Sequence, residues 1–231
     1  MAQVGPIIIE SLLNNTVCFL DQEPWQEVFR SAIQPDEVFS DRGELAISLW
    51  IHMASIPGLF RSVTTLVSSA SSPTQSYIDT IRCQITQHRT SFVYWSQRFH
   101  IISSKYPYPA PPPTSLIGFP SKEVTLCDLR PYLFATYLSC VILMNRLLTA
   151  LLPASSPALE IESQSLAGEI SEILRHVSHN SPCGHLFMGQ TVVTADATLR
   201  TAGDWNIAEK ESIIDHKAFK RWNSLLGRKV D

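Results

Sequence analysis

The sequence has few charged residues and few glycines. Asp, Glu, Lys and Arg make up 17% of the 231 residues, against about a quarter in an average globular domain. Glycine occurs nine times, and no long alternation of apolar and polar residues marks a strand. The formal net charge of −3 lacks the basic excess of an autonomous nucleic-acid-binding protein, so direct binding to nucleic acid is not expected. Apolar residues make up 45%, which is enough for a sizeable core.

Paired cysteines, signature motifs and long hydrophobic runs are also missing. The five cysteines, at positions 18, 83, 127, 140 and 183, form no CxxC pair, which is typical of reduced thiols in an intracellular protein, cytoplasmic or nuclear. GxGxxG, GxxxxGK[ST] and HExxH do not occur, so no cofactor is expected. The start, MAQVGPIIIESLLNN, has no basic region and too short an apolar run for a signal peptide. The most apolar stretch, residues 132–144, is shorter than the ~20 residues of a membrane span and is interpreted as a buried helix.

Helical periodicity is the main positive signal. It predicts an all-α fold, a single multi-helix bundle over residues 1–231 with long central helices at 74–105, 125–152 and 159–178. The first of these has one apolar stripe at three- and four-residue steps: Ile78, Ile81, Ile85, His88, Phe92, Trp95, Phe99 and Ile102. The second is apolar on most sides, which predicts a central position. Shorter helices are predicted at 40–56, from Pro57, from Pro24, and near 186–201 and 207–226.

The stretch 106–120, YPYPAPPPTSLIGFP, contains six prolines and is not compatible with a helix. We interpret it as an extended, polyproline-like connector between two packed halves of one domain.

A compact group of metal-capable side chains lies at the end of the third long helix: His176, His179, Cys183 and His185. These residue types bind zinc, but their intervals match no standard zinc spacing. A histidine near a helix C-terminus also interacts favourably with the exposed carbonyls. We therefore assign no metal site and keep the cluster only as a candidate.

Candidate ligand-binding residues occur at two places. They are Trp50 and His52, beside the Pro57–Gly58 break, and Tyr94, Trp95, Arg98 and Tyr137, on the two longest predicted helices. His52, Tyr94 and Arg98 are the catalytic candidates, because a histidine with a nearby acid can move protons. In the alternative interpretation Trp95 is core, His52 and His88 are hydrogen-bonded at the core edge, and Arg98 is solvated.

The C-terminal segment HKAFKRWNSLLGRK is basic and amphipathic. Its five basic residues are expected on a solvated face or against an acidic partner: Lys217, Lys220, Arg221, Arg228 and Lys229. Trp222, Leu225 and Leu226 are expected to dock this segment on the core.

The order of these features resembles a known family. PWQEVFRSAI is followed by LAISLWIHMASIPGLFRSV, a helix ending in FVYWSQRFH, the proline-rich connector and LCDLRPYLFATYLSCVILMNRLL. The segment SLAGEISEILRHVSHNSPCGHLFMGQTVVTADATLR comes next. From about Pro24 onwards this layout resembles the C-terminal regulatory region of fungal-specific transcription factors of the zinc binuclear cluster class. Members of that family carry six cysteines in a basic N-terminal DNA-binding module, and no such module is expected here.

The resemblance implies an all-helical scaffold that binds a small molecule or another protein within a fungal secondary-metabolite gene cluster. One hypothesis is a regulatory protein that acts through a hydrophobic ligand or a protein partner, with self-association into a homo-oligomer left open. The other is a cofactor-independent cyclase or isomerase acting on a hydrophobic polyketide or terpenoid intermediate. An enclosed apolar cavity of ligand size favours the enzyme, whereas a filled core with an exposed apolar surface favours the protein partner.

Overall fold

The protein is an all-α helical bundle, as the periodicity predicts. The computed structural model describes residues 4–33, 44–68, 74–105, 130–151, 156–180, 189–205 and 216–229, and these contain no strand. Their elements are α1 (Val4–Leu13), a short 3-10 helix η1 (Phe19–Asp21), α2 (Glu23–Ser31), α3 (Glu44–Met53), α4 (Ile56–Ser68), α5 (Gln75–Lys105), α6 (Arg130–Leu151), α7 (Ser156–Asn180), α8 (Gly189–Arg200) and α9 (His216–Leu225).

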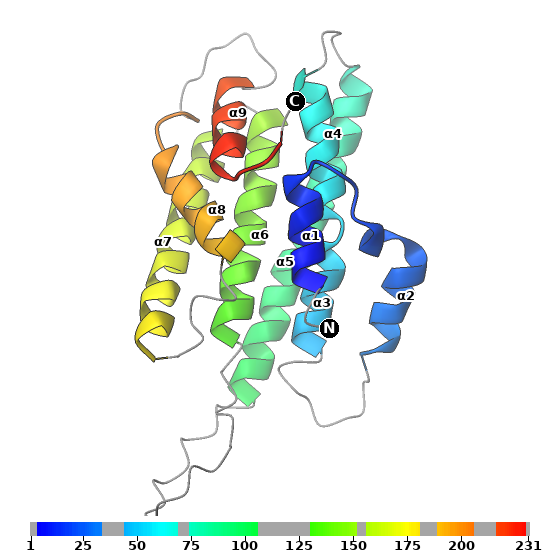
Figure 1. The fold of residues 1–231 in the computed structure, drawn as a ribbon, viewed down its shortest axis with the longest axis vertical. Coiled ribbons are helices and arrows are strands. Elements are labelled where there is room, and N and C mark those ends of the chain that lie inside the picture. Colours follow the sequence, from blue (N-terminus) through cyan, green and yellow to red (C-terminus); the bar gives the residue numbers. More distant parts are fainter. Residues whose placement is uncertain are drawn as a thin grey trace, which may run out of the picture.

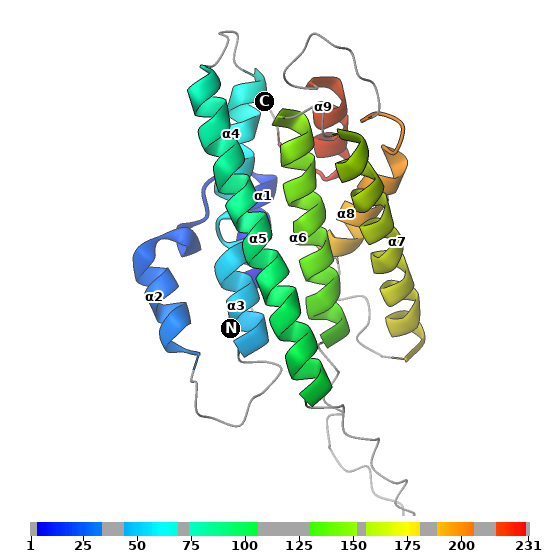
Figure 2. The ribbon, with the colours of Figure 1, turned by 180° about the vertical axis from the view of Figure 1, so that it is seen from behind.

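Helix α6 lies at the centre of the bundle between α5 and α7 (Figures 1 and 2). Every residue from 138 to 151 is buried, which explains why this helix is apolar on nearly all sides. It is long and apolar enough to cross a membrane, but 83% of its most apolar window is buried inside the protein. That burial is typical of a core helix.

The two sides of α6 are covered by different parts of the chain. Helices α1, α3 and α4 pack on the α5 side, and α8 and α9 pack on the α7 side. One continuous cluster of buried hydrophobic side chains includes residues from every one of the described α-helices. The proline-rich connector predicted at 106–120 lies outside the described residues.

The predicted stripe of α5 is confirmed. All its apolar members are buried, and His88 is half-buried in the same row. The helix therefore presents one face to α3, α4 and α6 and leaves the opposite face exposed.

The break between α3 and α4 falls earlier than expected. The sequence predicts one helix over 40–56 and a second from Pro57, whereas the chain turns at Ala54 and Ser55 and α4 begins at Ile56. Pro57 thus stands in the first turn of α4, where its missing N–H has no cost. The amide of Leu59 donates to the carbonyl of Ser55 at 3.2 Å, which makes Ser55 the N-cap residue of α4.

Helix α1 was not predicted. It packs on α4 and α3 and buries Ile8 and Leu12. Elsewhere the described helices agree with the predicted ones apart from their ends. Parts of the predicted helices lie outside the described residues: 40–43, 125–129, 152, 186–188 and 207–215. The docking of α9 is confirmed, since Trp222 and Leu226 are buried and Leu225 is half-buried.

Candidate functional site

Two of the predicted ligand-binding residues meet inside the bundle. Trp95 of α5 and Tyr137 of α6 stack with ring centroids 5.5 Å apart, and the indole N–H of Trp95 donates to the carbonyl of Leu45 at 3.0 Å. Trp95 is 3% exposed, so its ring and its polar atom are both used in packing. Trp50 is half-buried on α3 and packs against the same core.

The catalytic candidates lie apart from one another. Tyr94 is 66% exposed on the outer face of α5. Arg98 is also exposed, and its Nε donates to Glu44 at 2.9 Å. His52 is half-buried on α3, with its ring edge-on to Phe92. The six predicted residues therefore do not surround one common space within the described part of the chain.

The candidate metal cluster is only partly described. His176 is exposed on α7 and His179 lies in the last turn of that helix, whereas Cys183 and His185 lie outside the described residues. Within the described ranges, no three His, Cys, Asp or Glu side chains come close enough together to hold a metal ion.

A small cavity lies between α1, α6, α8 and the α3–α4 turn. Its volume is about 30 Å³, and its walls are mainly aliphatic, with Met53 and Ile56 on either side of the turn. The amide nitrogen of Gln190 is buried beside it without a hydrogen-bond partner among the described residues. This volume corresponds to about one water molecule, whereas pockets for drug-sized ligands measure roughly 300–1,000 Å³.

A hydroxyl, two imidazoles and a carboxylate gather where α3 meets α4. The Oγ atom of Ser55 lies 3.1 Å from Nδ1 of His88 on α5 and 3.0 Å from the carbonyl oxygen of His52. Asp21, on η1, interacts electrostatically with His88. We refer to Asp21, His52, Ser55 and His88 as the histidine cluster. The sequence singled out its two histidines but gave no signal for Asp21 or Ser55, because neither lies at a fixed spacing from His88.

Burial sets the charge state of the histidine cluster. It lowers the pKa of His88, against the opposing effect of Asp21, and it lowers the pKa of His52, with a smaller contribution from the charge of His88. Partial burial of the carboxyl raises the pKa of Asp21, although the charge of His88 opposes this. Both imidazoles are therefore neutral at pH 7. The hydroxyl of Ser55 has one proton, which it donates to the carbonyl oxygen of His52 in α3. The direction of its contact with Nδ1 of His88 is set by the tautomer of the imidazole.

Residues close to Asp21 in the sequence form an exposed apolar surface. Val17, Phe19, Trp25 and Val28 are between 43% and 55% exposed, and the rings of Phe19 and Trp25 meet edge to face at 5.5 Å. We call these four residues the η1–α2 face. Helix α2 packs against α3 and η1 and stands at the margin of the bundle (Figures 1 and 2).

The sides of α2 are unusual for a helix at a protein surface. Its buried side carries Gln26 and Phe29, and the amide of Gln26 donates to the carbonyl of Leu20 at 2.8 Å. Its exposed side carries Trp25 and Val28. A soluble surface helix usually turns such side chains inward. Adjoining exposed apolar side chains are a feature of interaction sites.

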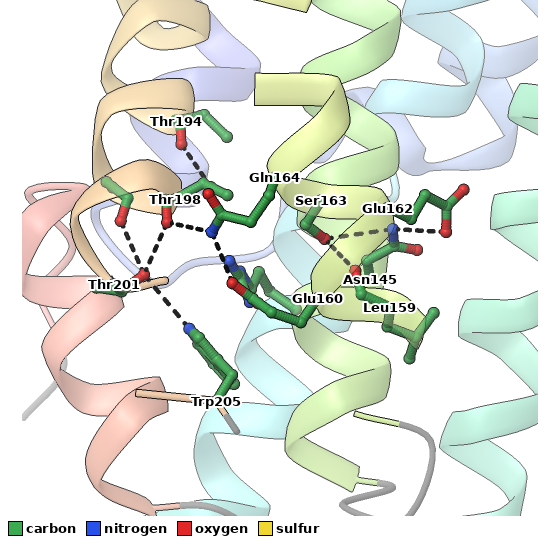
Figure 3. Close-up of polar contacts among 12 residues, drawn as sticks. Asn145, Leu159, Glu160, Glu162, Ser163, Gln164, Thr194, Thr198, Thr201 and Trp205 are labelled. Atoms are coloured by element: carbon green, nitrogen blue, oxygen red, sulfur yellow. Dashed lines mark hydrogen bonds and ion pairs between the residues drawn. The ribbon is translucent and has the colours of Figure 1, made fainter. Parts of the chain in front are cut away.

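A second polar group lies deep in the bundle, between α6, α7 and α8 (Figure 3). Arg146 and Glu160 form an ion pair whose side chains are 0% and 4% exposed, and the guanidinium lies 4.5 Å from the ring centroid of Trp205. Gln164 donates to Glu160 at 2.6 Å and to the carbonyl of Thr198 at 2.8 Å. These contacts connect three helices, so we interpret the group as a structural clamp.

A related link joins α5, α6 and α7 at the edge of this group. Arg89 donates through Nε to Asn145 at 2.8 Å and through Nη2 to both oxygens of Glu162 at 2.6 and 2.7 Å. Asn145 in turn donates to Glu162 at 3.0 Å, as Figure 3 shows. The three side chains largely satisfy one another, which again indicates a structural role.

The expectation that Arg228 is solvated is wrong. Its side chain is buried and donates to the carbonyl of Leu12 and the side chain of Asn15, both at 2.9 Å, and also to Asn223 and Thr64. The chain reverses direction after α9 because Gly227, at φ +74°, takes the left-handed conformation that glycine adopts without strain. This turn points Arg228 towards α1. Its guanidinium lies 4.6 Å from the ring centroid of Phe60.

Comparison with known proteins finds no relative: the chain matches no protein-family model, no curated protein and no solved structure.

Proposed function

We propose that this protein is a regulatory protein that acts by binding another protein at the η1–α2 face. The observation that carries the proposal is the exposure of Trp25 and Val28 on α2, whose buried side carries Gln26 beside Phe29. Tryptophan is enriched among the residues that dominate binding energy at protein interfaces. A cavity of about 30 Å³ beside the α3–α4 turn also gives no support to a large bound metabolite.

The setting of this function is proposed on sequence layout alone. The resemblance to regulatory regions of fungal transcription factors suggests control of secondary-metabolite biosynthesis, inside the cell, in the cytoplasm or nucleus. In that setting the protein would act through the partner that it docks. A cofactor-independent cyclase or isomerase is the alternative, and it has less support because His52, Tyr94 and Arg98 do not converge.

The proposal is tested by photo-crosslinking in the producing cell. A photoreactive amino acid replaces Val28 in the full chain, and a control carries it at Ile161, which is 72% exposed on α7. We expect a defined adduct from position 28 and none from position 161. We also expect Trp25→Ser combined with Val28→Ser to change transcript levels while the helical circular dichroism signal is kept.

Two outcomes count against the proposal. One is the absence of an adduct from position 28. The other is a change in pathway intermediates with unchanged transcripts when the gene is deleted, which would favour the cyclase.

A further inference from the structure

The charged residues around the η1–α2 face are mostly acidic. Residues 17–31 contain three acids, Asp21, Glu23 and Glu27, and one base, Arg30. Glu23 forms an ion pair with Arg30, which leaves its charge compensated. Glu27 is exposed and has no ion-pair partner within the described ranges, and it directly precedes Val28 in α2. The exposed apolar side chains are therefore accompanied by uncompensated negative charge.

We infer that the η1–α2 face docks a basic amphipathic helix of a partner protein, an inference that rests on the proposed function. An amphipathic helix binds by laying its apolar side chains at i, i+3, i+4 and i+7 on an apolar surface. Phe19, Trp25 and Val28 supply that surface. The Lys or Arg residues that flank the apolar stripe of the partner then pair with Glu27 and Asp21.

The two kinds of contact have different consequences. Burial of the aromatic and aliphatic side chains supplies most of the affinity, with Trp25 as the central contact. The acidic residues lie at the rim, where charge sets the association rate, its dependence on salt and the choice of partner. An acidic helix with the same apolar stripe is therefore rejected by repulsion.

The inference is tested with two synthetic helical peptides and the full chain. Each peptide is about 18 residues long with Leu at one-face spacing, and the remaining positions are Lys in one peptide and Glu in the other. By calorimetry we expect the Lys peptide to bind at least about tenfold more tightly, with an affinity that falls as NaCl rises from about 0.05 to about 0.3 M.

Matched variants separate docking from general attraction to an acidic protein. Trp25→Ser combined with Val28→Ser should abolish binding of the Lys peptide, whereas Ile161→Ser combined with Leu199→Ser should leave it unchanged. Glu27→Lys should weaken the Lys peptide by about tenfold or more and favour the Glu peptide. Glu172→Lys, an equal change of net charge at an exposed position on α7, should do neither.

The following results would overturn the inference. Both peptides could bind equally or not at all, or the Lys peptide could still bind after Trp25 and Val28 are replaced. A concentration-dependent dimer that the same replacement abolishes would show that a second copy covers the face. A partner that is crosslinked at position 28 through an acidic segment would also overturn the inference, but it would support the proposed function. The absence of any adduct at position 28 would contradict the proposed function itself.

Discussion

Replacement of Arg228 by alanine should destabilise the protein strongly, although this residue lies among exposed lysines and arginines. The guanidinium is buried without a carboxylate partner among the described residues, and its N–H groups donate to neutral acceptors on α1, α4, α9 and the turn after α1. Burial lowers the pKa of Arg228 from its ordinary value to about 10. That shift corresponds to a cost of about 3 kcal/mol for holding the charge inside the protein.

The favourable contacts of Arg228 must therefore exceed this cost. A hydrogen bond from a charged donor contributes about 1.5–3 kcal/mol, and an acceptor left unpaired in the interior costs about 1–3 kcal/mol. Loss of the side chain leaves the carbonyl of Leu12 and the side chain of Asn223 without this donor. We expect Arg228→Ala to lower the free energy of unfolding by about 3–5 kcal/mol.

The measurement is urea unfolding followed by circular dichroism and tryptophan fluorescence, together with the melting temperature. For a chain of this size the loss corresponds to a fall in Tm of about 6–20 °C. Arg221→Ala is the matched control, because Arg221 is exposed and pairs with Asp204 at 2.8 Å, and a surface pair contributes at most about 1 kcal/mol. Equal and small effects of the two variants would refute the reasoning. A gain in stability with Arg228→Met would refute it too, since methionine leaves the same acceptors unpaired.

Three further predictions concern the interior. Arg146→Met should cost about 3–5 kcal/mol because it leaves the carboxylate of Glu160 buried without its charged partner, with only the hydrogen bond from Gln164. Arg146→Met combined with Glu160→Leu should recover most of that loss in a urea double-mutant cycle. The free energy of unfolding should fall as pH falls below 6.5, because His88 has a lowered pKa in the folded protein and the unfolded chain therefore binds protons that the folded one does not. His88→Gln should flatten this dependence in unfolding curves recorded from pH 7.5 downward. An unchanged slope would contradict the prediction. A thiol reagent should modify the exposed Cys83 in the native protein but Cys140 only in urea, as detected by peptide mapping. The reason is that burial raises the pKa of the Cys140 thiol to about 12. Modification of Cys140 in the native protein would contradict the packing of α6.

The sequence predicted those helices whose apolar residues follow a helical period. The apolar stripe of α5 and the apolar character of α6 on all sides were sufficient to place both helices. A helix buried on one side has apolar residues at helical spacing, and a helix buried on all sides is apolar throughout. Helix α1 was missed because Ile7, Ile8 and Ile9 are consecutive, and a run of adjacent isoleucines has no helical period.

The candidate site was less accessible to sequence reasoning. The contact between Ser55 and His88 joins residues 33 positions apart on different helices, and no local spacing predicts such a pair. Trp25 and Phe29 are both large and apolar, yet only Phe29 is buried. The contacts of α2 with η1 and α3 decide which side of α2 faces the bundle, and these contacts are not visible in the sequence. Arg228 was misjudged for the same reason, since the turn at Gly227 sends it back into the protein.

The contact between Arg228 and α1 has a consequence for synthesis of the chain. Residues 12 and 228 are 216 positions apart, and at about 5–20 residues per second α1 is made roughly 10–40 s before the arginine that holds it. During that interval Ile8 and Leu12 have α3 and α4 to pack against but not this anchor. Helix α1 is made before the other described helices, yet this anchor forms only after residue 228 has been made, so we expect α1 to detach more readily in a chain that stops short of that residue.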